Sequence, residues 1–265
     1  MNFRDLAPSH CQQQREERVL PTLATGPIQA VLLDVDGTLY YQQRLRSCMA
    51  CELCVLPVVQ MSCSAACDIW RALSMFRRVR EGLRHVGEAD VCLAQWQYSA
   101  AAQRIGWQPA VLENLVIEWF YQRPLKYLRF CRRRGLEAFC AFLENRGIQI
   151  GVFSDYPVMD KLKSLGVADR MSVALCATDP EINAFKPSPK GFLHACRLWG
   201  LRPAEVLYVG DRPEVDTVGA LHAGMPCVIL APWTRQERQS DMPSAYKTIA
   251  SFARLQRALL RGDIS

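Results

Sequence analysis

Acidic residues stand directly after an apolar run near the start of the chain. Asp34 and Asp36 follow residues 28–33, which are apolar except for Gln29, and Gly37 comes next. A short apolar run bounded by turn residues is typical of a strand buried on both faces, as in a parallel sheet. Carboxylates at such a place suit Mg²⁺, a hard cation that keeps water ligands and is usually shared with a substrate phosphate. The metal would cancel the repulsion between a carboxylate and an anionic phosphate.

Further polar residues follow, or lead to, later strands of the same kind. Ser154 ends the apolar run 148–153, Asp211 follows the run 206–209, and Lys186 precedes the helix that leads to that second run. Ligands of an open parallel sheet bind at the carboxyl ends of its strands, so we expect these side chains to converge on the first strand's aspartates. Lysine and a hydroxyl group would then donate to phosphoryl oxygens.

Each residue also has an ordinary structural interpretation. Asp-Gly is a common turn, Ser154 is a suitable cap or turn residue, and Lys186 before a proline is typical of a solvated loop. Asp211 could cap the helix that begins at Pro213. Their joint placement at successive strand ends favours one functional site.

Strands and helices alternate over much of the chain. After the first strand, the pattern predicts strands at 148–153, 173–176, 206–209 and 227–230, separated by helices at 136–147, 157–165, 188–199 and 213–223. Alternation with short connections predicts a doubly wound parallel sheet, an α/β fold.

A long insertion interrupts this alternation. Its apolar residues recur at near-helical spacing, as in Ile69, Leu73 and Phe76, which predicts an all-helical segment. The predicted organisation is a flexible leader at 1–26, a core at 27–44 and 128–232, a helical segment at 45–127, and a tail at 233–265 with one helix at 249–260.

Composition excludes several classes of protein. The chain has 265 residues, of which 50% are hydrophobic and 22% charged, so disorder, collagen and coiled coil are excluded. The net charge of +6 is too small to indicate a nucleic-acid partner. We interpret the local arginine clusters as solvated helix faces, with an electropositive rim for an anionic substrate as the alternative. These clusters are Arg71, Arg77, Arg78, Arg80 and Arg84, and then Arg132, Arg133 and Arg134.

The cysteine content and the lack of a long apolar segment indicate the cellular compartment. The 12 cysteines are too few for a disulfide scaffold, and residues 1–21 have no secretory pattern. No apolar run has the length of a membrane span. We therefore predict reduced thiols in a cytoplasmic protein without a membrane partner. The cluster Cys48, Cys51, Cys54, Cys63 and Cys67 is interpreted as a buried helix face rather than a zinc site.

Taken together, the polar motifs resemble those of the haloacid dehalogenase (HAD) superfamily of phosphohydrolases. The motifs, in chain order, are Asp34–Leu39, Val152–Ser154, Lys186–Pro189, and Gly210-Asp211 with Asp216. The resemblance spans about residues 28–231 and implies a Rossmann-like core. The helical segment resembles a cap inserted between the first two motifs, which in this family closes over the site and selects the substrate.

The resemblance also implies roles in catalysis. Asp34 would be the nucleophile that forms an aspartyl-phosphate. Asp36 would protonate the leaving alcohol and then activate water. Ser154 and Lys186 would bind the phosphoryl oxygens. Dehalogenase members lack an acid at the position of Asp36, so its presence implies an oxygen leaving group.

A second set of implied roles concerns the metal. Asp34, the backbone carbonyl of Asp36, and Asp211 would hold Mg²⁺. Asp216 would be an outer carboxylate that orients Lys186 or a metal-bound water. Arg212 stands where the family often has a small hydroxyl residue, and it could touch the substrate or pair with Glu214.

The function implied is that of a Mg²⁺-dependent phosphatase, a phosphoric monoester hydrolase acting on a small phosphorylated metabolite. A sugar-phosphate mutase of the same superfamily is an alternative, because it shares these motifs and a helical cap. A non-catalytic HAD-like binding or regulatory protein is another. The motifs leave the oligomeric state open, and the cap arginines have few interleaved aromatic residues, which disfavours nucleic acid.

Overall fold

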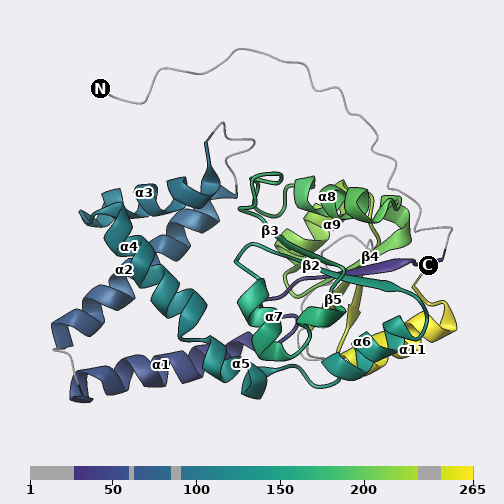
Figure 1. Ribbon diagram of the computed structural model, residues 1–265, viewed down its shortest axis with the longest axis horizontal. Helices are drawn as coiled ribbons and strands as arrows, with labels where there is room; N and C mark the ends of the chain where they lie inside the picture. The colour runs from purple at the N-terminus through teal and green to yellow at the C-terminus, as the bar shows by residue number, and fades with distance from the viewer. Residues whose placement is uncertain (1–26, 60–62, 85–90, 232–245, 265) are drawn as a thin grey trace, which may run out of the picture.

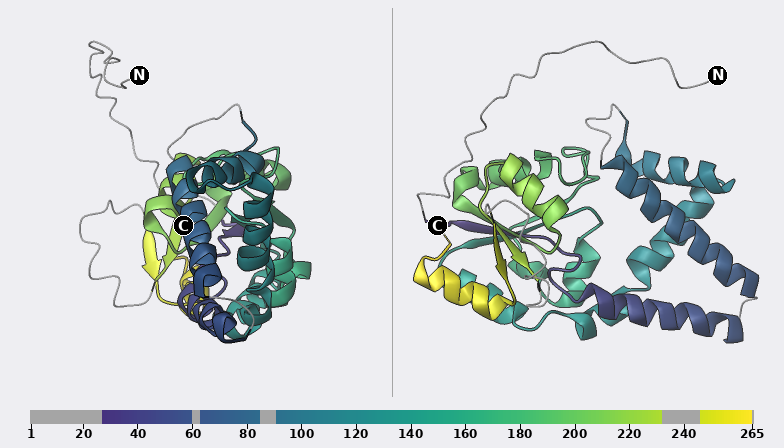
Figure 2. Two further views of the ribbon diagram at one scale, coloured as in Figure 1. Left: turned by 90° about the vertical axis from the view of Figure 1, so that its left-hand side faces the viewer. Right: turned by 180° about the vertical axis from the view of Figure 1, so that it is seen from behind.

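The chain is described as a computed structural model, which covers residues 27–59, 63–84, 91–231 and 246–264. The predicted leader at 1–26 and residues 233–245 of the predicted tail lie outside this part. Figures 1 and 2 show a sheet covered by helices on both faces, with further helices to one side.

Within the described ranges, the core is a six-stranded parallel sheet, in the order β3-β2-β1-β4-β5-β6. The strands are β1 (Ala30–Leu33), β2 (Gln149–Ser154), β3 (Val173–Cys176), β4 (Val206–Gly210), β5 (Cys227–Leu230) and β6 (Lys247–Ile249). Ala30 pairs with Gln149 on one side and with Val206 on the other, so β1 is central. All four residues of β1 are fully buried, which explains their unbroken apolar sequence.

Helices bury both faces of the sheet. They are α6 (Leu136–Glu144), α7 (Met159–Leu165), α8 (Lys190–Trp199), α9 (Val218–His222) and α11 (Phe252–Arg261), with short helices at Ala168–Arg170, Pro203–Glu205 and Pro213–Thr217. Ala30 and Leu32 belong to the apolar cluster that includes Phe192 of α8, whereas Val31 and Leu33 belong to the cluster that includes Phe139 of α6. The predicted α/β fold with a doubly wound parallel sheet is confirmed.

The end of the chain differs from the prediction. The run 227–230 is not the last strand, because β6 pairs with β5, Val228 opposite Lys247. β6 has three residues, two of them half-buried, so its sequence carries no alternation long enough to detect. α11 begins at Phe252, after Ser251, whose side chain accepts a hydrogen bond from the Arg254 backbone N–H.

Residues between β1 and β2 supply a separate group of helices. They are α1 (Gln42–Val59), α2 (Cys63–Leu83), α3 (Leu93–Ile105), α4 (Pro109–Val116), a helix at Ile117–Gln122, and α5 (Leu125–Cys131). Figure 1 shows α1 to α4 on the side toward which β1 runs. We call the helices from Gln42 to Cys131 the cap.

The chain enters and leaves the cap through adjacent segments. Tyr40 and Arg132 form an antiparallel bridge, and the Tyr41 backbone N–H donates to the Cys131 carbonyl at 2.9 Å. The Arg133 backbone N–H donates to the Leu39 carbonyl at 2.9 Å. These bonds fix where the cap begins and ends relative to β1, and therefore relative to Asp34 and Asp36.

Candidate active site

Asp34 lies at the carboxyl end of the central strand and is almost completely buried, with 4% of its surface exposed. Its backbone N–H donates to the Val209 carbonyl at 2.8 Å, which extends the pairing of β1 with β4. Its Oδ1 accepts a hydrogen bond from Lys186 Nζ at 2.6 Å. Its Oδ2 is buried and has no hydrogen-bond partner among the described residues. Asp34 Oδ1 is thus held by Lys186, whereas Asp34 Oδ2 is available to another group.

Lys186 is brought to Asp34 by the loop before α8, where the Lys186-Pro187 peptide bond is cis. Besides Asp34, its ammonium donates to Asp216 Oδ1 at 2.8 Å and to the Tyr208 hydroxyl at 2.9 Å. Burial alone would lower the pKa of Lys186, but Asp216 and Asp34 outweigh it, and the pKa is raised. Lys186 is therefore a fixed cation beside Asp34.

Asp216 orders the loop that follows β4. Its Oδ2 accepts from the backbone N–H groups of Asp211 at 3.1 Å and Arg212 at 2.9 Å, and its Oδ1 accepts from Lys186 and Tyr208. A side chain at position 210 would collide with it, since a Cβ there would lie 2.4 Å from Asp216 Cγ. Because both oxygens already have donors, Asp216 is better suited to positioning than to binding a metal.

Asp34, Asp211 and Asp216 form a cluster in which one carboxylate oxygen from each residue lies within 4.8 Å of the other two. In these residues, Asp34 Oδ2 and Asp211 Oδ1 are buried without a hydrogen-bond partner among the described residues. Burial and the neighbouring carboxylates raise the pKa of Asp34 well above its usual range, and burial with Asp216 raises the pKa of Asp211 to about 7. Unpartnered oxygens and mutual repulsion fit a divalent cation with oxygen ligands.

Gly37 makes room for this cluster. Its φ is +101°, and a Cβ there would lie 2.2 Å from Asp211 Oδ2. A residue with a side chain would therefore strain the turn after Asp36 and displace Asp211.

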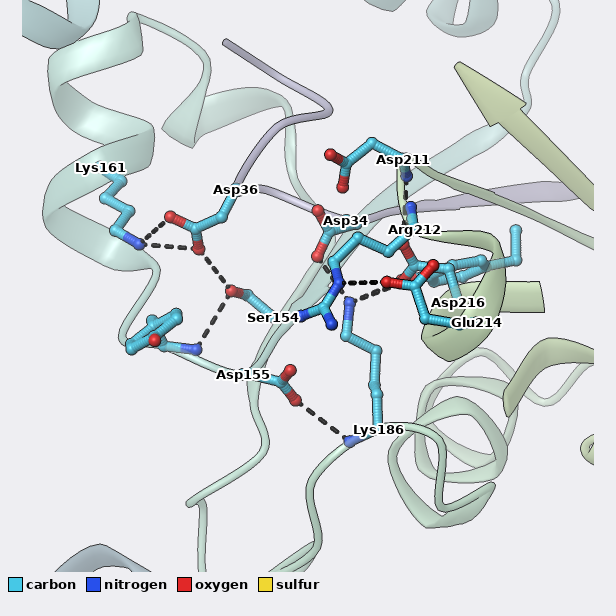
Figure 3. A network of polar contacts seen from close by, with 12 residues as sticks. Asp34, Asp36, Ser154, Asp155, Lys161, Lys186, Asp211, Arg212, Glu214 and Asp216 are labelled. Atoms are coloured by element: carbon cyan, nitrogen blue, oxygen red, sulfur yellow. Dashed lines mark hydrogen bonds and ion pairs between the residues drawn. The ribbon is translucent and has the colours of Figure 1, made fainter. Parts of the chain in front are cut away.

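Asp36 lies apart from that cluster, as Figure 3 shows. Lys161 Nζ donates to its Oδ1 at 2.6 Å and to its Oδ2 at 2.8 Å. The Ser154 hydroxyl donates to Oδ2 at 3.0 Å, and the Tyr40 hydroxyl donates to Oδ1. Burial would raise the pKa of Asp36, but Lys161 and the two hydroxyl groups outweigh it, so the pKa is lowered. Asp36 is held as a carboxylate beside Ser154.

All the residues singled out in the sequence therefore lie around one site, in two groups. Asp34, Lys186, Asp211 and Asp216 form one group, while Asp36 and Ser154 form the other with Lys161 and Tyr40. Lys161, Tyr40 and Tyr208 were not predicted. Tyr40 is four residues from Asp36, a spacing that could have indicated it, whereas a lysine in α7 carries no distinguishing signal.

Asp155 connects the site to the cap. Its Oδ2 accepts from Arg84 of α2 at 2.6 Å, and its Oδ1 accepts from the Lys186 backbone N–H at 3.1 Å. Arg84 also donates to the Lys186 carbonyl at 2.7 Å. Burial would raise the pKa of Asp155, but Arg84, Lys186 and Arg80 lower it. The Arg84–Asp155 ion pair thus connects the cap to the core and contacts the backbone of Lys186.

The interpretation of the arginine clusters as solvated faces is wrong for Arg80, Arg84 and Arg133. Arg80 and Arg133 are 3% and 8% exposed, and the Arg84 side chain is 8% exposed. Arg80 donates to the Asp155 carbonyl at 2.5 Å, and Arg133 donates to the Gly37 carbonyl at 2.5 Å. A guanidinium can be buried when it has enough carbonyl and carboxylate acceptors, and tertiary contacts supply them here. Arg71 and Arg78 are exposed.

Arg212 pairs with Glu214 at 2.9 Å, one of the two alternatives considered, and also with Glu81 of α2 at 3.1 Å. The Glu81 contact is a second ion pair between cap and core.

The interpretation of the cysteine cluster as a buried face is also wrong. Cys51, Cys54 and Cys67 are exposed and Cys48 is half-buried, all as free thiols, and the Cys63 side chain lies outside the described residues. α1 packs against α2 and α5 with part of its surface. The rest of its surface is in contact with solvent, although much of its sequence is apolar.

The site opens into a cavity of about 980 Å³ between core and cap. Its lining includes Asp34, Asp36 and Lys186 from the core and Arg77, Trp119 and Phe120 from the cap. Within the described ranges, no helix is both long and apolar enough to cross a membrane.

The chain is similar to known hydrolases over most of its length. Residues 28–224 match the model of a hydrolase family described as haloacid dehalogenase-like hydrolase. A glyceraldehyde 3-phosphate phosphatase from Methanopyrus kandleri is 28% identical over 219 residues, which cover 81% of this chain and 87% of the relative. A phosphoserine phosphatase from Thermus thermophilus is 26% identical over 149 residues, 56% of this chain and 57% of the relative.

Solved structures show the same fold. A 2-haloacid dehalogenase from Pseudomonas syringae pv. Tomato superposes with a TM-score of 0.60 at 21% identity, covering 89% of this chain and 99% of its own. A HAD phosphatase from Thermococcus onnurineus gives a TM-score of 0.56 at 24% identity, covering 88% and 98%. These likenesses confirm the predicted Rossmann-like core, and the named relatives support the predicted class of phosphoric monoester hydrolase. The chain belongs to the haloacid dehalogenase-like hydrolase family, as its motifs predicted.

Proposed function

We propose that the protein is a Mg²⁺-dependent phosphatase that hydrolyses a small phosphate monoester through an aspartyl-phosphate. The observation that carries the proposal is the state of Asp34. Its Oδ2 is buried without a hydrogen-bond partner among the described residues, while its Oδ1 is fixed by Lys186. The residue lines the cavity, so a substrate phosphate could reach it. Phosphatases among the relatives support the same reaction class.

In the first half-reaction, one carboxylate oxygen of Asp34 would attack phosphorus and the bond from phosphorus to the leaving alcohol oxygen would break. The negative charge of the bound phosphate would favour uptake of a proton by Asp36, which would then give that proton to the departing oxygen. The Lys186 ammonium and the Ser154 hydroxyl would donate to the phosphoryl oxygens. Ser154 donates to Asp36 in the structure, so it would have to turn from that carboxylate to the phosphate.

In the second half-reaction, Asp36 as a carboxylate would take a proton from water, and the water oxygen would attack phosphorus. The bond to Asp34 would then break and release inorganic phosphate. The proton taken from water restores the acid that Asp36 needs for the next cycle. Lys161 favours the ionised form, as the lowered pKa of Asp36 indicates. Asp36 is thereby suited to act as a base in this step.

A divalent cation would complete the charge balance. Asp34, Asp211 and the backbone carbonyl of Asp36 are the proposed ligands, and Mg²⁺ held there would neutralise charge on the phosphoryl oxygens. Asp216 would keep Lys186 and the Asp211 loop in place, since it binds both.

The test is hydrolysis of p-nitrophenyl phosphate with Mg²⁺ by the wild-type protein and by Asp34→Asn. We expect the variant to lose activity by about 10³-fold or more, because an amide is a poor nucleophile. Asp169→Asn, which changes an exposed aspartate away from the cavity, is the control. Rapidly quenched wild-type protein should carry a phosphoryl group on Asp34 by mass spectrometry. Activity that survives Asp34→Asn would exclude this nucleophile.

A further inference from the structure

The cap side of the cavity carries positive charge that the proposed reaction does not use. The charged residues of the cap that line the cavity are Arg46, Arg77, Glu81 and Arg84. Glu81 is paired with Arg84 at 2.8 Å and with Arg212 at 3.1 Å, and Arg84 is also paired with Asp155. The other two charged residues, Arg46 and Arg77, form no ion pair with a carboxylate in the part of the chain that the structure describes.

Arg77 is held in place without an acidic partner among the residues that the structure describes. Its guanidinium carbon lies 4.5 Å from the centroid of the Phe120 ring, and both residues line the cavity. Stacking on an aromatic face orients a guanidinium and leaves its N–H groups free to donate at the edge. Arg77 is exposed and lines the cavity, and no hydrogen bond or ion pair among the described residues involves its guanidinium.

Arg46 and Arg77 line the same cavity as the proposed catalytic residues Asp34 and Asp36. Although Arg77 is exposed, the protein around the cavity removes part of its water and lowers its pKa, Arg46 lowers that pKa further, and Tyr156 and Tyr40 oppose the shift. The Tyr40 hydroxyl donates to Asp36, the group that would protonate the leaving alcohol, and both residues line that cavity. Two like charges that line one cavity repel each other, and an anion bound between them would offset that repulsion.

We infer that Arg46 and Arg77 form a subsite for a second anionic group on the substrate, in the alcohol portion released from phosphorus. The inference rests on the proposed phosphatase function and specifies its substrate class. The substrate is a phosphate monoester whose alcohol carries a carboxylate or a further phosphate. Arginine suits both groups because its planar fork binds two oxygens at once. The cavity of about 980 Å³ has room for such a molecule.

Matched pairs of substrates test this directly. The first pair is 3-phosphoglycerate and glycerol 3-phosphate, in which a carboxylate is replaced by a hydroxymethyl group. The second is the bisphosphate and the monophosphate of 1,4-butanediol. In at least one pair, we expect kcat/KM to be about 10- to 100-fold higher for the substrate with the second anion, the size of a charged hydrogen bond. The pair that shows the larger ratio identifies the anion as a carboxylate or a phosphate.

Variants then assign the preference to the two arginines. Arg77→Met and Arg46→Met should each reduce the kcat/KM ratio within a pair toward one, and Arg77→Lys should restore part of it. A loss of folded protein cancels in this ratio, because both substrates meet the same enzyme. Arg78→Met, which changes an exposed neighbour on α2 outside the cavity, should keep the wild-type ratio.

The possible failures are distinguishable. Equal kcat/KM within both pairs, or a ratio unchanged in both arginine variants, overturns the subsite while hydrolysis itself stands. Absence of hydrolysis of every monoester tested, including p-nitrophenyl phosphate, overturns the phosphatase proposal on which the subsite rests.

Discussion

Two lysine side chains bind three of the aspartates of the site. Lys186 binds Asp34 and Asp216, and Lys161 binds both oxygens of Asp36. In this way the proposed nucleophile and the proposed acid-base group each have a counter-charge of their own. The chemistry proposed for Asp36 therefore depends on Lys161, which holds its carboxylate in place.

Replacing Lys161 tests that dependence. In Lys161→Met, Asp36 loses its ion pair and its fixed position, so kcat/KM for an alkyl phosphate should fall about 10- to 100-fold. The fall should be smaller for p-nitrophenyl phosphate, because p-nitrophenolate leaves without a proton. Lys163→Met, on the exposed side of the same helix, is the matched control. An equal fall for both substrates would show that Lys161 acts only on the structure.

The carboxylate cluster predicts a pH-dependent response to metal. Because the pKa of Asp211 is raised to about 7, the metal-free folded protein binds protons that the unfolded chain releases above about pH 4. Stability without metal should therefore fall as pH rises from about 4 to 7, and Mg²⁺ should restore it at pH 8.

Thermal unfolding at several pH values, with EDTA or with Mg²⁺, measures this response. Asp211→Asn should flatten the fall and should reduce the Mg²⁺-induced rise in Tm. A variant that responds to Mg²⁺ as the wild type does would argue against Asp211 as a ligand.

At the scale of elements, close packing fixes the loops that carry the site. β2 ends at Ser154, and α8 follows the loop that carries Lys186. Their contact is tight, because a Cβ at Gly191 would lie 2.1 Å from Phe153 Cζ. The Phe153 ring also meets the Phe192 ring edge-on, with centroids 5.1 Å apart. The separation of Ser154 and Lys186 therefore depends on a glycine in α8.

Gly191→Ala should destabilise the protein by about 1–3 kcal/mol, since the added methyl group overpacks a rigid aromatic contact. Gly82→Ala in α2 is the matched helical control. Apart from its own helix backbone and chain neighbours, no atom of the described residues lies within 4 Å of a Cβ there, and alanine should stabilise the helix slightly. Urea unfolding of both variants measures the difference. A neutral Gly191→Ala would show that β2 and α8 can separate at little cost.

At the scale of the whole molecule, cap and core are joined by ion pairs as well as by the chain. Arg84–Asp155 at 2.6 Å is largely buried, whereas Arg212–Glu81 at 3.1 Å is in contact with solvent. Buried pairs are screened less by salt than exposed ones. The Arg84–Asp155 pair is therefore the one expected to govern how firmly the cap is held over the site.

Asp155→Asn should lower stability at pH 7 by about 2 kcal/mol, the value of a hydrogen bond to a charged group. Because the pKa of Asp155 is lowered in the folded protein, its contribution is present above about pH 4 and disappears as pH falls through the folded value. The difference in free energy of unfolding between the wild type and Asp155→Asn should thus shrink below about pH 4. A constant difference at all pH values would mean that the charge of Asp155 is unimportant.

The sequence by itself determined the order of elements and the main polar residues of the site. Apolar runs such as 30–33 and the residues that follow them are local features, and parallel strands place their carboxyl ends at one edge of a sheet. Asp34, Ser154 and Lys186 could therefore be assigned to one site before any contact was known. The three-residue strand β6 could not be predicted from the sequence, because it forms only through its pairing with β5.

Only the tertiary structure decided which charges are paired. Arg84 and Asp155 are 71 residues apart, and Lys161 and Asp36 are 125 apart, so no local pattern relates them. It also showed that some arginines of α2 are buried by distant acceptors, whereas Arg77 faces the cavity without a carboxylate among the described residues. Burial and ion pairing are properties of contacts between remote segments, and those contacts exist only once cap and core have packed together.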